Sequence, residues 1–125
     1  MRSNHVILEA VYPTIEIATT NRLENYLGPL GRFTEPLLLT QLHARLGISA
    51  NDLRPIDHVA SIRCPLLIIS GASDRNTRPK DTQMLFSSAE SPKNLWLVPN
   101  AGHVDLHRAA TAEYESRVLV FLARM

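Results

Sequence analysis

Pro65-Leu-Leu-Ile-Ile-Ser-Gly-Ala-Ser-Asp74 is a short apolar run followed by a glycine and, three residues later, an acid. No polar side chain interrupts residues 65–69, and a short strand that is apolar on both faces is typical of a parallel sheet covered by helices. The runs Leu95-Trp-Leu-Val98 and Val6-Ile-Leu-Glu-Ala-Val11 predict two further strands. Because predicted helices separate the strands, the sequence indicates an α/β fold with three parallel strands and right-handed crossovers.

Residues 13–47 form a block that predicts two helices. Thr14 as N-cap and Gly28 as a left-handed stop bound the first, and a turn follows at residues 28–31. Thr34 as N-cap and Gly47 bound the second, with Pro36 near its first turn. The apolar residues of the second helix are Leu37, Leu38, Leu39, Leu42 and Leu46. They crowd one broad face, so we expect this helix to be largely buried.

The rest of the chain alternates irregular and helical segments. Residues 49–63 are polar, and Pro55 is expected to break any helix there. A helix is predicted from about Pro79 to Ala89, and a C-terminal helix from about Thr111. The residues of this last helix that we expect to face the core are Tyr114, Val118, Leu119, Phe121 and Leu122.

Composition narrows the class of protein. The chain has 125 residues, which suggests one domain over residues 1–125, and a formal net charge of +1. No basic stripe favours nucleic acid or an anionic membrane, and no apolar run has the length of a signal peptide or a membrane span. The single cysteine, Cys64, cannot form an internal disulfide, which fits a reducing compartment. We therefore expect a cytoplasmic protein, and no motif predicts a cofactor.

Asp74 and His103 each follow the end of a predicted strand. Ligands of open parallel sheets bind at the carboxyl ends of strands, so these two side chains are candidates for catalysis. A carboxylate there can fix the tautomer of a histidine, and a histidine with an ordinary pKa near 6.5 can move a proton to and from a nucleophile. The chain order acid and then histidine is that of the last two members of a Ser-Asp-His triad.

Other roles for these residues stay open from the sequence alone. Asp74 can cap the following turn, and His103 can be a loop histidine bonded to backbone. His103, Asp105 and His107 alternate, so in an extended segment they would share one face and could bind a metal. Alternatively, Asp105 and His107 line or cap the loop before the last helix, with Asp105 orienting the segment around His103.

The chain resembles the C-terminal portion of a bacterial α/β-hydrolase, a member of the serine hydrolase superfamily. The segments that resemble it are Val6–Pro13, Leu53–Asp57, Pro65–Asp74 and Leu95–Leu106. The resemblance implies that the three strands are the last three of an eight-stranded sheet and that residues 13–47 form a helical cap over the cleft. It assigns the acid to Asp74 and the general base to His103.

The nucleophile of that family does not map onto this sequence. It lies in a Gly-x-Ser-x-Gly turn between a strand and a helix. Gly47-Ile-Ser49-Ala-Asn51 has the right order but lacks the second glycine and follows a leucine-rich helix. Ser70 and Ser73 are too close to Asp74, and Cys64 precedes its strand, where a small core residue is expected. The donors of the oxyanion hole would also lie outside this sequence.

Two classes of function therefore remain. The chain is either the acid–base half of a serine hydrolase for ester, thioester or amide bonds, inactive alone, or a non-catalytic remnant or partner-dependent binding module. An unpaired edge at residues 6–11 predicts self-association, or a partner that supplies the missing strands.

Overall fold

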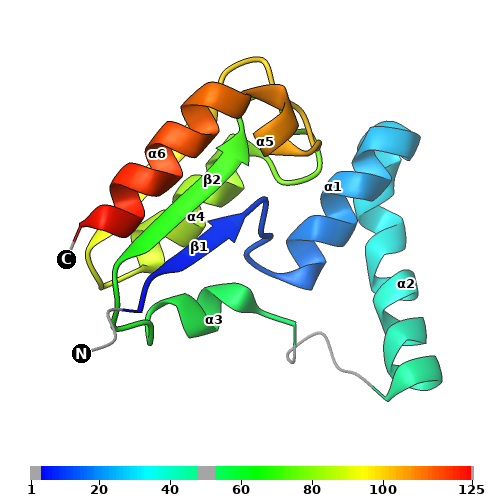
Figure 1. Ribbon diagram of the computed structural model, residues 1–125. Coiled ribbons are helices and arrows are strands. Elements are labelled where there is room, and N and C mark those ends of the chain that lie inside the picture. The colour runs from blue at the N-terminus through cyan, green and yellow to red at the C-terminus, as the bar shows by residue number, and fades with distance from the viewer. Residues whose placement is uncertain (1–3, 48–52, 125) are drawn as a thin grey trace.

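The computed structural model describes residues 4–47 and 53–124, and its centre is a three-stranded parallel sheet (Figure 1). The strands are β1 (Val6–Glu9), β2 (Leu66–Gly71) and β3 (Lys93–Val98), in the order β1-β2-β3. All six residues of β2 are buried because it is the middle strand, and both pairings are parallel. The predicted α/β class with parallel strands is confirmed. β1 is shorter than predicted, because Ala10 has a φ of 53° and turns the chain away from β2.

Helices cover both faces of the sheet. α6 (Thr111–Ala123) covers one face, and α3 (Pro55–Val59) and α4 (Pro79–Ser88) cover the other. Successive side chains of a strand point to opposite faces, so β2 contributes to both cores. The core under α6 includes Leu67, Ile69, Trp96, Val98 and Phe121, and the core under α4 includes Val59, Leu66, Ile68 and Leu85. Pro55 begins α3 instead of breaking it, because proline is well suited to the first helical position.

α6 faces the core with only one side. Tyr114, Val118 and Phe121 pack against the core at helical spacing, as predicted. Leu119 and Leu122 are 66% and 47% exposed, so their predicted burial is wrong. A helix in an outer layer contacts the sheet along one stripe, and these two residues lie beside that stripe.

A short helix, α5 (Leu106–Ala109), precedes α6 and was not predicted from the sequence. Its N-cap is Asp105, whose carboxylate accepts the backbone N–H groups of His107 and Arg108. None of the helices in the described ranges is long and apolar enough to cross a membrane.

A helical pair stands beside the sheet, as Figure 1 shows at the right. It consists of α1 (Ile15–Leu27), a 3₁₀ turn η1 (Gly28–Leu30) and α2 (Gly31–Leu46). Thr14 caps α1 as predicted, since its hydroxyl accepts the N–H of Ile17 at 3.2 Å.

Two predictions about α2 are wrong. It begins at Gly31 rather than after Thr34, because the missing side chain of Gly31 lets the helix start against the backbone of Leu23. Leu37 and Leu38 are 68% and 47% exposed rather than buried, because α2 packs on α1 and not on the sheet.

Candidate acid–base site

The Asp74 carboxylate lies just past the end of β2 with a fully buried side chain. Its Oδ1 accepts the backbone N–H groups of Asn76 and Thr77, each at 2.8 Å. Its Oδ2 lies 2.9 Å from Nδ1 of His103. Asp74 therefore caps its own turn with one oxygen and orients the histidine with the other. The turn-capping role and the histidine-orienting role expected from the sequence are thus compatible.

The His103 ring is 39% exposed, in contrast to its partner. A carboxylate at Nδ1 favours the tautomer in which Nδ1 holds the proton and Nε2 has the free lone pair. This is the arrangement that a general base needs, since Nε2 can then accept a proton from a nucleophile.

The loops after β2 and β3 meet because the two strands are parallel neighbours that end together, with Gly71 opposite Val98. The N–H of Ser73 donates to the carbonyl oxygen of Ala101 at 2.8 Å and joins the loops. A Cβ atom on Gly71 would overlap the same carbonyl oxygen. Glycine at this position therefore allows the close approach that brings Asp74 and His103 together.

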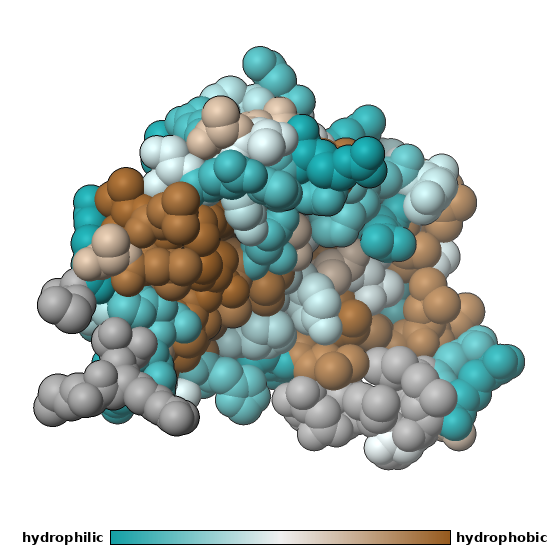
Figure 2. Space-filling view, in the orientation of Figure 1, coloured by the Kyte–Doolittle hydropathy of each residue, from teal (hydrophilic) through white to brown (hydrophobic). Residues whose placement is uncertain are grey.

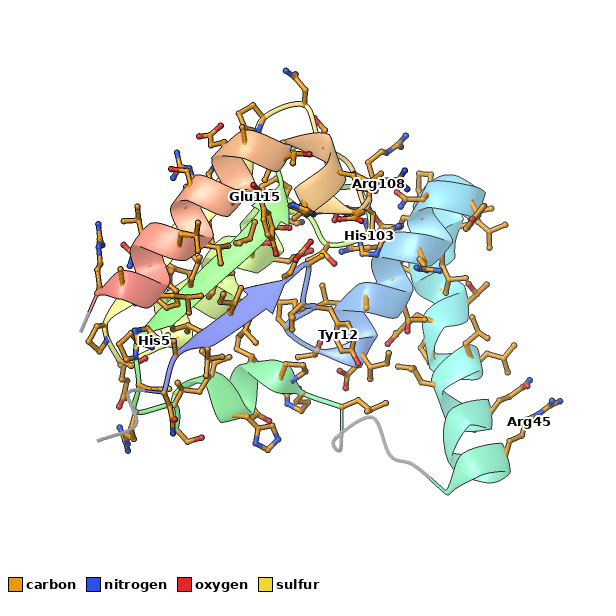
Figure 3. The ribbon with its side chains drawn as sticks, in the orientation of Figure 1. His5, Tyr12, Arg45, His103, Arg108 and Glu115 are labelled. Carbon is orange, nitrogen blue, oxygen red and sulfur yellow. The ribbon has the colours of Figure 1, made fainter. Side chains whose placement is uncertain are left out.

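His103 also lines a cleft of about 370 Å³ at the carboxyl end of the sheet. Figure 3 shows His103 at the end of the sheet that faces α1. The other lining residues are Ala10, Tyr12, Ile15, Ala18, Thr19, Arg22, Asn76 and Thr77. They come from the segment after β1, from α1 and from the Asp74 loop, so α1 forms one wall of the cleft.

Asn21 holds that wall in place and was missed in the sequence. Its buried Nδ2 donates to the carbonyl oxygen of Asn76 at 2.9 Å and to Oδ2 of Asp81 at 2.7 Å. No local sequence pattern marks this role, because the two partners lie 55 and 60 residues away along the chain. Asn21 connects α1 to the loop that bears Asp74.

Within residues 4–47 and 53–124, no hydrogen bond joins His103 to Ser70, Ser73 or Cys64, the other residues weighed as nucleophiles. Ser49 lies outside the described ranges. The Oγ of Ser70 is buried and has no hydrogen-bond partner among the described residues, whereas Ser73 is exposed. Cys64 is free and half-buried at the start of β2, the opposite end of the sheet from the cleft.

The alternating residues after β3 contact different partners instead of converging. His103 bonds Asp74, Asp105 caps α5, and the Nε2 of His107 lies 2.9 Å from a carboxylate oxygen of Glu115. Within residues 4–47 and 53–124, no three His, Cys, Asp or Glu side chains are placed to hold a metal ion. The cap role weighed for Asp105 is confirmed by its bonds to α5.

No protein-family model and no curated protein matches this sequence. Among solved structures, it is similar to an esterase from Pyrococcus furiosus, with a TM-score of 0.65 and 19% identity over 96% of this chain and 43% of that one. The chain has part of the α/β-hydrolase fold. A hydrolase from Pseudomonas aeruginosa matches with a TM-score of 0.59 and 19% identity, over 96% of this chain and 56% of that one.

A serine hydrolase involved in carbazole degradation also matches, with a TM-score of 0.62 and 12% identity, over 98% of this chain and 55% of that one. The α/β-hydrolase-like chain thus spans about half the length of these structures.

Proposed function

We propose that this chain supplies the general acid–base pair of a serine hydrolase that cleaves an ester, thioester or amide bond. The observation that supports it best is the 2.9 Å contact between Asp74 and His103, formed at the carboxyl ends of two neighbouring parallel strands. The cleft beside His103 and the likeness to part of the α/β-hydrolase fold add support.

In the proposed reaction, the nucleophilic serine comes from a segment other than the one described. His103 takes the hydroxyl proton at Nε2 as the serine oxygen bonds to the acyl carbon, and then gives it to the leaving alcohol, thiol or amine as the old bond breaks. Water repeats both transfers and releases the acid and the serine. Asp74 orients the ring and stabilises its positive charge, and the α1–α2 pair acts as a cap.

The test compares this chain with a protein extended by the reading frame immediately upstream. The chain alone is expected to hydrolyse no p-nitrophenyl acetate and to resist a fluorophosphonate probe. The extended protein is expected to react with both, and H103A is expected to lower its turnover by about a thousandfold or more. Labelling of Ser49 in the chain alone, or full activity of the extended H103A variant, would contradict the proposal.

The partner that we propose for the open side of β1 is a parallel strand from the segment that contains the serine. Val6 and Ala10 donate their N–H groups to the carbonyl oxygens of Pro65 and Ile69, on the β2 side, so the peptide groups of Ile7 and Glu9 point to the open edge. Figure 2 shows an apolar area over α6 that extends toward β1, where Leu119 and Leu122 are exposed. A strand followed by a helix would cover both the edge and this area.

N-methylation of the Ile7 amide tests the edge, because it removes one outward N–H and leaves the bonds that Val6 and Ala10 donate toward β2. The modified residues 1–63 can be ligated to residues 64–125 at Cys64. Without its partner, the unmodified chain is expected to self-associate in sedimentation velocity and the methylated chain to remain monomeric. Equal association of the two would argue against pairing through this edge.

A second candidate is a binding module without catalysis, which the cleft itself favours. The cleft measures about 370 Å³, which lies within the usual size of a small-molecule site. An extended protein that binds small esters next to His103 but never turns them over would favour this function.

A further inference from the structure

One face of α1 lines the cleft with four residues at helical spacing. Ile15, Ala18, Thr19 and Arg22 are related by steps of three and four residues, so they share one side of the helix. The face changes along its length from an apolar residue, through two small ones, to a guanidinium. A ligand that reaches from His103 along this wall would therefore meet apolar surface and a fixed positive charge.

The charge of Arg22 has no acidic partner in the described part of the chain. Its neighbours one helical turn away are Ala18, Thr19, Asn25 and Tyr26, none of which is acidic. No ion pair among residues 4–47 and 53–124 includes Arg22, whereas Arg32 and Arg78 both pair with Glu24.

Among the residues that the structure describes, the cleft wall also contains no carboxylate to balance this cation. The acid nearest to His103, Asp74, is fully buried behind the ring and is occupied by three donors. Guanidinium groups bind carboxylates and phosphates through paired, charge-assisted hydrogen bonds.

We propose that Arg22 binds an anionic group of the ligand, so that the cleft selects esters with a carboxylate at the end remote from the scissile bond, such as half-esters of dicarboxylic acids. This inference rests on the proposed function, since it takes the reacting end of the ligand to lie at His103.

The test uses the chain itself with two probes of similar shape, monomethyl glutarate and dimethyl glutarate. The ring signals of His103 are followed by NMR while each ester is added. The half-ester is expected to bind about fivefold more tightly than the neutral diester, the size expected for an ion pair in contact with water. Added salt is expected to reduce this preference.

Three variants locate the charge that matters. R22Q is expected to lower the preference below about twofold while the diester still binds. R45Q removes the same charge from α2, and Arg45 is exposed and lies at the far end of that helix from His103 (Figure 3). R108Q removes a charge from α5, five residues after His103, at a position that does not line the cleft. Both are expected to keep the preference.

The role of Arg22 would be overturned if the two esters bound equally well, or if neither shifted the His103 signals. It would also be overturned if R22Q kept the preference for the half-ester, or if R108Q lost that preference to the same extent as R22Q. Equal binding of the two esters beside His103 would leave the proposed hydrolase function intact. Full activity of the extended H103A protein would instead refute that function, so the two failures are distinguishable.

Discussion

Replacement of Asp74 by alanine tests whether the turn and the histidine depend on the same carboxylate. The change leaves the buried N–H of Thr77, the half-buried N–H of Asn76 and Nδ1 of His103 without their acceptor. A buried unsatisfied donor costs about 1–3 kcal/mol, and the other two groups lose less because water can reach them. We expect D74A to lower the free energy of unfolding by about 2–4 kcal/mol. With an ordinary urea dependence, the midpoint falls by about 1–2 M.

D74N separates the two roles of the side chain. Its amide oxygen can still accept both backbone N–H groups, so the expected loss of stability is only about 1 kcal/mol. Its amide N–H then faces His103, and the imidazole must present a lone pair at Nδ1 and hold its proton at Nε2. Nitrogen-15 NMR of the ring is expected to show this change of tautomer.

The control is D57A, because the Asp57 side chain is 53% exposed and, among the described residues, pairs with Arg54 alone. It is expected to cost less than about 1 kcal/mol. The reasoning would be refuted if D74A were no more destabilising than D57A, or if D74N left the histidine proton at Nδ1.

Three further predictions concern the surroundings of the site. G71A is expected to cost about 2–3 kcal/mol in urea unfolding and to shift the His103 signals, whereas G102A, which meets no atom closer than 4.0 Å, is expected to cost less than about 1 kcal/mol. Burial, and secondly the hydrogen bond that its hydroxyl donates to the Glu9 carboxylate, raise the pKa of Tyr114 above its usual 10.0. The folded state therefore holds the phenol proton more tightly than the unfolded state does. The contribution of Tyr114 to the free energy of unfolding is complete below about pH 10 and is lost as the pH rises through the pKa of the folded state. In thermal melts, the melting temperature is expected to differ less between pH 9 and pH 11 in Y114F than in the unmodified protein. N21A is expected to lower the free energy of unfolding by about 1–3 kcal/mol, because the buried carboxylate of Asp81 in α4 loses a donor. It is also expected to speed hydrogen exchange of the amides in α1, and unchanged exchange would argue against an anchoring role for Asn21.

The central strands and the acid–base pair could be predicted because their signals are local. A five-residue apolar run predicts a strand buried on both faces, and β2 is buried throughout. Parallel neighbouring strands end at the same edge, so residues shortly after them meet, as Asp74 and His103 do. Thr14 was predictable for the same reason, since a cap bonds within its own turn.

Burial on the helices could not be predicted as well, because it depends on which elements are neighbours. Leu37 and Leu119 read as core residues, yet α2 packs on α1 and α6 contacts the sheet along one stripe, so both side chains are exposed. Asn21 was overlooked because its partners, Asn76 and Asp81, lie 55 and 60 residues away. No local pattern contains such contacts.

The separation of Asp74 from His103 along the chain has a consequence for the order in which the molecule assembles. Asp74 and His103 are 29 positions apart, with α4 and β3 between them, whereas the contact between His5 and Arg124 spans 119 positions. The fourfold shorter loop costs about 1.2 kcal/mol less conformational entropy to close. We therefore expect the pair to form before the termini dock, and to persist when they fray.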